Sequence, residues 1–277
     1  MPGEPKEGQN QEENKAIDEL EKWKLFDEAK RKLTVSVKDI IPEMNVDGLT
    51  LRGDERLMDE DVARRLVHLP SGLSTSFARQ MYEPKYWAKE EERKALEQLA
   101  DEVEKVFKGQ IVVDIGAGPG GWGYLMADRA GAEAYVAVEP VFADELLYRI
   151  TSIQNPGLEP KNPFSTPIVP KHEIKKIPIS IVQEDMLSFL RRLPADSVSV
   201  LCSGIDKEVI SLSGKYYEQK VVNEIVRVVN PNGAYVGQRF MHLRLPESDK
   251  IEEIVAGNKD EDLGSFEAVS IYKKKKK

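Results

Sequence analysis

An apolar run that opens into a cluster of glycines is the feature that most restricts the fold of this chain. Residues 111–123 read IVVDIGAGPGGWG. Successive β-branched residues suit a strand buried on both faces, and glycines allow a sharp turn and a close backbone approach to a ligand. A short helical pattern follows at residues 122–129, so loop amides and the positive end of a helix dipole would face that ligand. The segment predicts a strand, a ligand-binding loop and a helix.

The glycines do not identify the ligand by themselves. Gly116, Gly118 and Gly121 also satisfy the fingerprint G-x-G-x-x-G, in which a dinucleotide pyrophosphate rests on a helix N-terminus. A tight strand-to-helix turn with no ligand is another interpretation of the same residues. Both interpretations stay open at this point.

Composition narrows the class of protein. Of the 277 residues, 40% are hydrophobic and 32% are charged, and no apolar stretch approaches the roughly 18 residues of a membrane helix. The first residues lack the basic start and apolar core of a secretory signal, so we expect a cytoplasmic protein that uses no membrane. A net charge of −8 argues against a surface that wraps nucleic acid, although a local basic patch remains open.

The cysteine and histidine content predicts no metal site. Cys202 is the single cysteine, so it forms no internal disulfide, and its apolar neighbours place it on a strand. His68 and His172 have no cysteine or carboxylate cluster at metal-ligand spacing.

The chain divides into a helical N-terminal part and an α/β part. Residues 1–14 have nothing apolar after Met1, so they are expected to form a disordered tail. Residues 15–108 are predicted to form a helical cap region, and residues 273–277 a basic tail. Turn residues predict a loop over 42–53. The helices predicted in the cap region cover 17–33, 54–68, 74–82 and 84–108.

Residues 109–272 alternate short apolar runs with amphipathic helices, which predicts an α/β fold: a mostly parallel sheet with helices on both faces. Strands are predicted at 110–115, 134–139, 178–183, 197–202 and 234–238, and helices at 121–130, 141–154, 186–193 and 215–229. Residues 155–178 are rich in proline and are predicted to form a loop insertion, either a functional lid or a surface decoration.

Three carboxylates end neighbouring predicted strands, and ligands of such folds bind at that edge of the sheet. Glu139, after the second strand, could accept both hydroxyls of a ribose, in an NAD enzyme as well. Asp114 precedes the first glycine by two residues, where an NAD site needs no acid. Asp185, before an apolar residue, could accept an adenine amino proton while the next amide donates to the ring.

Together these elements resemble the class I S-adenosylmethionine-dependent methyltransferases, in which Asp-x-Gly-x-Gly-x-Gly follows the first strand. The resemblance spans about residues 109–240 and includes a Pro-Asn-Gly turn at 231–233 before the fifth strand. It implies a Rossmann-like methyltransferase domain over 109–272 and S-adenosylmethionine as cofactor. The residues implied to bind it are Asp114, Gly116, Ala117, Gly118, Gly120, Glu139, Pro140, Asp185, Met186 and Cys202.

In detail, the resemblance implies that the glycines approach the methionine moiety and that Asp114 orients the glycine loop and the amino-acid end. Glu139 would hold the ribose, and Asp185 with Met186 would face the adenine. The implied strand order is 3-2-1-4-5, with a terminal strand at about 266–273 added at the edge. The usual final antiparallel hairpin is not evident in the roughly 35 residues after the fifth strand.

The methyl acceptor is not identified by the usual motifs. The Gly-Pro-Gly-Gly-Trp stretch is similar to the loop of the 2′-O-ribose RNA methyltransferases, but that family's catalytic lysines do not follow. An amino-methylation motif of the Asn/Asp-Pro-Pro-Tyr type is absent after the fourth strand. Small molecules, RNA and protein all remain possible partners.

Two residues at the expected sheet edge are candidate general bases: Asp206 after the fourth strand and His242 after the fifth. Each also has a structural interpretation, as a loop or cap acid and as a strand-edge histidine. The leading hypothesis is a methyltransferase whose helical cap forms part of the acceptor pocket. The alternatives are a module that binds S-adenosylmethionine without catalysis and, third, an NAD-dependent oxidoreductase.

Overall fold

The computed structural model describes residues 21–45, 90–158, 172–203, 215–238, 245, 251–256 and 269–274. Among these residues, no helix combines the length and apolar character that a membrane crossing requires. The predicted tail 1–14 and the predicted helices at 54–68 and 74–82 lie outside the described residues.

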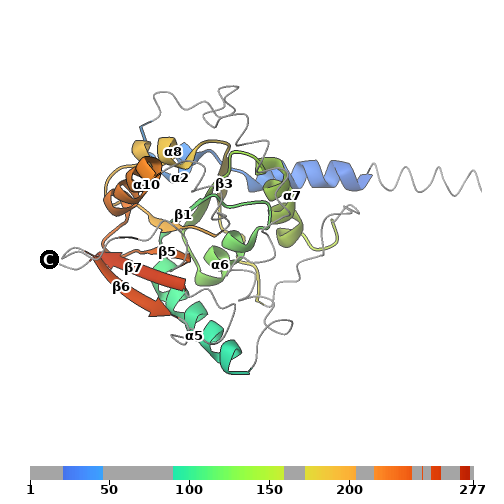
Figure 1. The fold of residues 1–277 in the computed structure, drawn as a ribbon. Coiled ribbons are helices and arrows are strands. Elements are labelled where there is room, and N and C mark those ends of the chain that lie inside the picture. The colour runs from blue at the N-terminus through green and yellow to red at the C-terminus, as the bar shows by residue number, and fades with distance from the viewer. Residues whose placement is uncertain are drawn as a thin grey trace, which may run out of the picture.

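A seven-stranded sheet lies at the centre of the described part of the chain (Figure 1). Its strand order is β3-β2-β1-β4-β5-β7-β6. The first five strands run parallel, and β7 is antiparallel to both of its neighbours. Their bounds are Ile111–Ile115 (β1), Ala134–Val138 (β2), Ile179–Val182 (β3), Ser199–Leu201 (β4), Tyr235–Gln238 (β5), Ile251–Ala256 (β6) and Val269–Lys274 (β7). The five predicted parallel strands are confirmed to within two residues at each end.

Helices cover both faces of the sheet (Figure 1). One face packs against α5, α6 and α7, and the other against α2, α8 and α10. The bounds are Val37–Ile40 (α2), Glu90–Phe107 (α5), Trp122–Ala130 (α6), Ala143–Gln154 (α7), Met186–Arg192 (α8) and Lys215–Val228 (α10). The mostly parallel α/β fold with helices on both faces is therefore confirmed.

Alternation along the strands explains how the sheet supports two cores. In β1, Val112 belongs to the cluster under α5, α6 and α7, whereas Val113 and Ile115 belong to the cluster under α8 and α10. All three side chains are fully buried. Such strands read as continuous apolar runs because both faces are covered, which is the pattern that identified β1 in the sequence.

The N-terminal segment crosses the β3 edge of the sheet. Residues 21–33 are helical, and Phe26 packs its ring against Tyr148 of α7. Thr34 then forms a parallel bridge with Ile179 of β3, and Val35 donates its amide to the Ile179 carbonyl at 2.9 Å. Beyond the edge, the buried side chains of Val37, Ile41 and Met44 join the cluster on the other face. We call residues 21–45 the strap; pairing and burial cover what would otherwise be an open strand edge.

The end of the sheet corrects the prediction of a single terminal strand added at the edge. β7 lies between β5 and β6, pairing Tyr235 with Tyr272 on one side and Ile254 with Ile271 on the other. The antiparallel hairpin that the sequence does not make evident is thus present. Its first strand reads IEEIVA, whose adjacent glutamates hide the alternation that predicts a strand. β7 also includes Lys273 and Lys274, the first two residues of the predicted basic tail.

Candidate functional site

The carboxyl ends of β1, β2, β3 and β4 meet at one edge of the sheet. The chain steps outward from β1 to β2 and β3, then returns to place β4 on the other side of β1. Loops that leave two adjacent parallel strands in opposite directions open a crevice between them, and ligands of α/β proteins bind there. The glycine loop leaves β1 at this crevice.

The glycine loop adopts a backbone that requires glycine. Gly116 and Gly118 have φ angles of 66° and 62°, in the left-handed region that other residues rarely occupy. The amide of Gly116 donates to the Val138 carbonyl of β2 at 2.8 Å, so the loop turns back over the neighbouring strand. The predicted strand and the predicted helix on either side of the glycines are confirmed, with α6 starting at Trp122.

Glu139, the first residue after β2, binds the glycine loop through its carboxylate. Its Oε2 accepts the Gly118 amide at 2.8 Å, and its Oε1 accepts the amides of Val141 at 2.9 Å and Phe142 at 3.1 Å. Burial raises the pKa of the Glu139 carboxyl, although these three backbone donors oppose the shift. Three donors occupy three of about four lone-pair sites of a carboxylate, so one acceptor site is left.

Asp114 lies in β1 beneath the loop and is fully buried. Its Oδ2 accepts the hydroxyls of Tyr135 at 2.7 Å and Ser203 at 2.6 Å, and its Oδ1 accepts the Ser203 amide at 3.1 Å. Burial raises the pKa of Asp114 to about 7, against the effect of these donors. The carboxyl therefore ties β2 and the first residues after β4 to the centre of the sheet.

The contacts of Asp114 and Glu139 show which carboxylate the glycine loop binds directly. The carboxylate that receives a hydrogen bond from the glycine loop is that of Glu139, whereas the hydrogen bonds of Asp114 come from Tyr135 and Ser203. The direction of the side chain follows from alternation, since Asp114 shares the α6 face of β1 with Val112. Gly123 of α6 packs against it so closely that an added Cβ would lie 1.9 Å from Oδ2.

Asp185 follows β3 and caps α8. Its Oδ1 accepts the Ser188 amide at 3.0 Å, and its Oδ2 accepts the hydroxyl of Tyr217 in α10. Met186, the first residue of α8, is buried beside it. The structure thus brings Asp185 and Met186 to the same sheet edge as Glu139, one strand further from β1.

The other predicted site residues divide into three groups. Ala117 is buried within the glycine loop, and the half-exposed Pro140 accepts a hydrogen bond on its carbonyl from the Gln183 side chain at 3.3 Å. Cys202 follows β4 and packs on the α8 and α10 face, where its amide donates to Val236 of β5. Asp206 and His242, the two candidate bases, lie outside the described residues.

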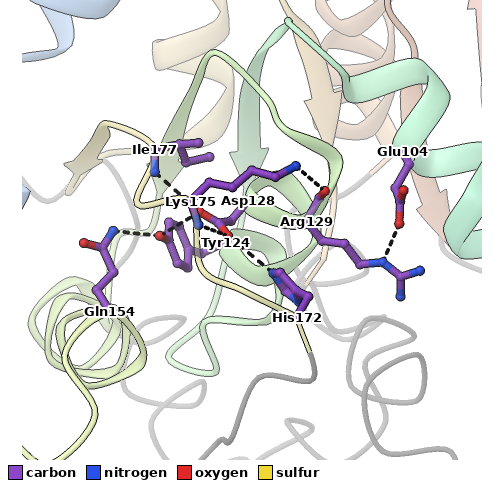
Figure 2. A network of polar contacts seen from close by, with 8 residues as sticks. All are labelled: Glu104, Tyr124, Asp128, Arg129, Gln154, His172, Lys175 and Ile177. Atoms are coloured by element: carbon purple, nitrogen blue, oxygen red, sulfur yellow. Dashed lines mark hydrogen bonds and ion pairs between the residues drawn. The ribbon is translucent and has the colours of Figure 1, made fainter.

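The two ends of the proline-rich insertion are linked through one buried carboxylate, that of Asp128, as Figure 2 shows. Asp128 of α6 accepts the amides of Lys175 at 3.0 Å and Ile177 at 3.4 Å. It also accepts the Tyr124 hydroxyl, which in turn receives a hydrogen bond from Gln154, the last residue before the insertion. Burial opposes ionisation of Asp128, but these donors and His172 outweigh it, so the pKa of Asp128 is lowered. The network fixes where the insertion leaves and rejoins the fold.

Sequence reasoning missed four residues of these networks: Tyr124, Asp128, Ser203 and Tyr217. Tyr124 and Asp128 contact each other over four residues, but each of the four also has a partner between 30 and 89 residues away, which no local spacing could have revealed. The one available signal was a polar residue inside an apolar helical pattern, as at Asp128 in WGYLMADRA. Within the described part of the chain, no group of histidine, cysteine and carboxylate side chains could hold a metal ion.

A family comparison decides the class of this site. Residues 95–187 match the FtsJ-like methyltransferase family, and this stretch contains the glycine loop, Glu139 and Asp185. Over these residues the chain is similar to the FtsJ-like methyltransferases, and it is an S-adenosylmethionine-dependent methyltransferase. S-adenosylmethionine is accordingly its cofactor, and the residues present fit it: two glycines with positive φ, Gly116 and Gly118, in the turn after β1, and a buried carboxylate, Glu139, after β2 with one acceptor site left. No curated protein sequence matches the chain significantly.

Several solved structures resemble this methyltransferase only distantly. A putative rRNA methylase from Clostridium thermocellum has 10% identity and a TM-score of 0.44, over 66% of this chain and 97% of that one. An rRNA methylase from Streptococcus thermophilus has 9% identity and a TM-score of 0.43, over 65% and 95%. A putative methyltransferase from Streptococcus mutans, in complex with SAH, has 7% identity and a TM-score of 0.43, over 65% and 98%. Scores this low assign no function, and the fold assignment stands on strand order and pairing.

Proposed function

We propose that this methyltransferase binds its cofactor along the carboxyl edge of β1, β2 and β3 and transfers the methyl group in line to an acceptor arriving from the β4 side. The proposal depends most on one observation: the glycine loop follows β1, Glu139 follows β2 and Asp185 follows β3, and these three strands are adjacent in the sheet. This order matches the methionine, ribose and adenine parts of one extended ligand. An NAD site would not call for the buried acid Asp114 before the first glycine.

Each part of the edge has a proposed role. The backbone at Gly116, Gly118 and Gly120 approaches the methionine moiety, since no Cβ stands in the way. Glu139 accepts the two ribose hydroxyls. Because three amides already use three of its about four lone-pair sites, at least one of them must be released when both hydroxyls bind. Asp185 accepts the adenine amino group, and Met186 lies beside the ring.

The charge of the site suits a cationic ligand. Asp114 and Glu139 are both buried, and burial raises the pKa of both carboxyls; the charge of Glu139 raises the pKa of Asp114 further, so positive charge nearby would relieve the cost of ionising them. S-adenosylmethionine carries its methyl group on a sulfonium and is therefore already activated, so the chain has to align the acceptor and exclude water. Ala117 within the loop and Trp122 at the start of α6 are mostly buried and keep this side apolar.

The proposed acceptor side follows from strand order. With ribose at β2 and adenine at β3, the methyl group lies near β1, whose other neighbour is β4. Ser203 after β4 is held there by Asp114. Asp206 and His242 stay the proposed general bases, because the chain segments that contain them follow β4 and β5.

The acceptor itself is left to experiment. The FtsJ-like match ends at residue 187, before β4 begins at Ser199, so it supports the cofactor half of the domain and not the acceptor half. We expect the reaction to take place in the cytoplasm, since a single cysteine gives the chain no disulfide to maintain.

Calorimetry of cofactor binding tests the proposal. The wild type should bind S-adenosylmethionine and not NAD, and tight binding of NAD alone would overturn the proposal. Glu139→Ala should weaken S-adenosylmethionine binding by about 1–3 kcal/mol, or about 5- to 150-fold, because two hydrogen bonds to ribose are lost. Glu133→Ala is the matched control, since Glu133 is exposed before β2 and should leave the affinity unchanged. An unaltered affinity in Glu139→Ala would remove Glu139 from the site.

A second assay addresses the acceptor. S-adenosylmethionine with a labelled methyl group is incubated with the protein and with RNA, protein and small-molecule fractions of a cell extract. Incorporation into one fraction, lost in Glu139→Ala and kept in Glu133→Ala, identifies the acceptor class. Absence of label in every fraction at saturating cofactor would contradict the proposed transfer.

A further inference from the structure

The Asp185 carboxylate does more than cap a helix. Capping uses Oδ1, which accepts the Ser188 amide at 3.0 Å. The second oxygen, Oδ2, accepts the hydroxyl of Tyr217, 32 residues further along the chain and on a different helix. A cap residue needs only one oxygen bound by the helix, so the contact with Tyr217 calls for another explanation.

The hydroxyl of Tyr217 is the donor in its hydrogen bond with Asp185. Its ring is half-buried and packs against the cluster between the sheet, α8 and α10. Burial raises the pKa of its hydroxyl far above the usual value, and the adjacent Asp185 carboxylate raises it further. The hydroxyl therefore keeps its proton at any physiological pH, and Oδ2 can only be the acceptor of this bond.

Two donors on different helices fix the Asp185 carboxylate. The amide on α8 and the hydroxyl on α10 each bind one oxygen, so the carboxyl group cannot rotate without losing a hydrogen bond. About two lone-pair sites remain for a ligand, and an ionised carboxylate offers acceptors only. Such a group favours a ring that presents an amino group and disfavours one that presents a carbonyl oxygen.

We propose that Tyr217 is a positioning residue that makes the cofactor site selective for adenine over hypoxanthine, by holding the Asp185 carboxylate as a fixed acceptor for the amino group. This inference rests on the adenine role proposed above for Asp185. Adenine and hypoxanthine differ at the group concerned, an amino donor in one and a carbonyl acceptor in the other. A carboxylate free to turn away, or to bind through water, would discriminate less between them.

The adjacent tyrosine provides a matched control. Tyr216 precedes Tyr217 in α10, but its side chain is 88% exposed, whereas that of Tyr217 packs against the core. Replacing either by phenylalanine removes one hydroxyl from the same turn of the same helix. Only the change at Tyr217 removes a donor to Asp185.

The test measures dissociation constants of S-adenosylhomocysteine and S-inosylhomocysteine by calorimetry for the wild type and variants. The wild type should prefer the adenosyl compound, and Tyr217→Phe should lower that preference about 10-fold, as expected for loss of one hydrogen bond to a charged group. Tyr216→Phe should keep the wild-type preference. A ratio of two affinities does not depend on the folded fraction, so a purely structural role of Tyr217 would leave it unchanged.

Asp185→Asn separates failure of this inference from failure of the proposed function. If Asp185→Asn keeps the wild-type preference, Asp185 does not read the adenine, and the adenine role itself is wrong. If Asp185→Asn lowers the preference but Tyr217→Phe does not, only the positioning role is overturned. In the Asp185→Asn background, Tyr217→Phe should have no further effect on the ratio, and a full additional loss would contradict the coupling between the two residues.

Discussion

The buried carboxyl of Asp114 predicts an unusual dependence of stability on pH. The variant is Asp114→Asn, which keeps the shape of the side chain and a carbonyl oxygen for the Ser203 amide. In the variant, the side-chain amino group can donate to the hydroxyl oxygen of Ser203 or Tyr135, and those hydroxyls no longer donate to residue 114 as they do in the wild type. Asparagine therefore imitates the protonated acid and removes only the titration.

The magnitude follows from the pKa. Folding raises the pKa of Asp114 from its ordinary 3.8 to about 7, so between these values the folded protein binds a proton that the unfolded chain has released. Stability from this group is complete below about pH 4 and is lost as pH rises to about 7. Three pH units correspond to about 4 kcal/mol in total, of which about 1.4 kcal/mol is lost between pH 6 and pH 8.

Urea unfolding followed by circular dichroism at pH 6, 7 and 8 measures this effect. The free energy of unfolding of Asp114→Asn, relative to the wild type, should rise by about 1.4 kcal/mol from pH 6 to pH 8. Asp144→Asn, at an exposed position in the first turn of α7, is the control and should show no such trend. A difference between Asp114→Asn and the wild type that is constant over this range would refute the reasoning. Such a constant difference would show that the three donors keep the acid ionised in the folded protein at pH 6 and above.

Three further predictions concern packing around the site. Gly123→Ala should destabilise the fold by more than about 2 kcal/mol and weaken cofactor binding in calorimetry, because the added Cβ would overlap the Asp114 carboxylate. Alanine in place of glycine in a helix normally stabilises the fold by up to about 1 kcal/mol, so a stabilised variant would contradict this geometry. Asp128→Ala should lower the free energy of unfolding by about 3 kcal/mol or more and speed hydrogen exchange of the Lys175 amide, since several buried donors lose their acceptor. Unchanged exchange at Lys175 would show that Asp128 does not anchor the insertion. Ile41→Ala should cost about 2–5 kcal/mol by urea unfolding, because its side chain is fully buried on the sheet; a loss below about 0.5 kcal/mol would show that the strap does not contribute to the core.

Local pattern predicted the parallel part of the sheet. The run at β1, the apolar strands that follow and the helices between them all appeared within two residues of their predicted ends, and α5 ends one residue before its predicted end; residues 84–89 of that predicted helix lie outside the described residues. Periodicity is a property of neighbouring residues, so it survives in the sequence. Periodicity did not reveal elements in which it is interrupted, as in β6, or elements of a single turn, as in α2 inside the strap.

The sequence by itself led to the methyl donor through a resemblance, because the glycine turn and the acids after the next two strands are local features at fixed places that resemble those of the S-adenosylmethionine-dependent methyltransferases. The tertiary structure decided what those acids touch. Glu139 reaches the Gly118 amide over 21 residues, Asp114 reaches Ser203 over 89, and Asp185 reaches Tyr217 over 32. Such partners are chosen by strand order and helix packing, which bring distant segments together, and no spacing along the chain records them.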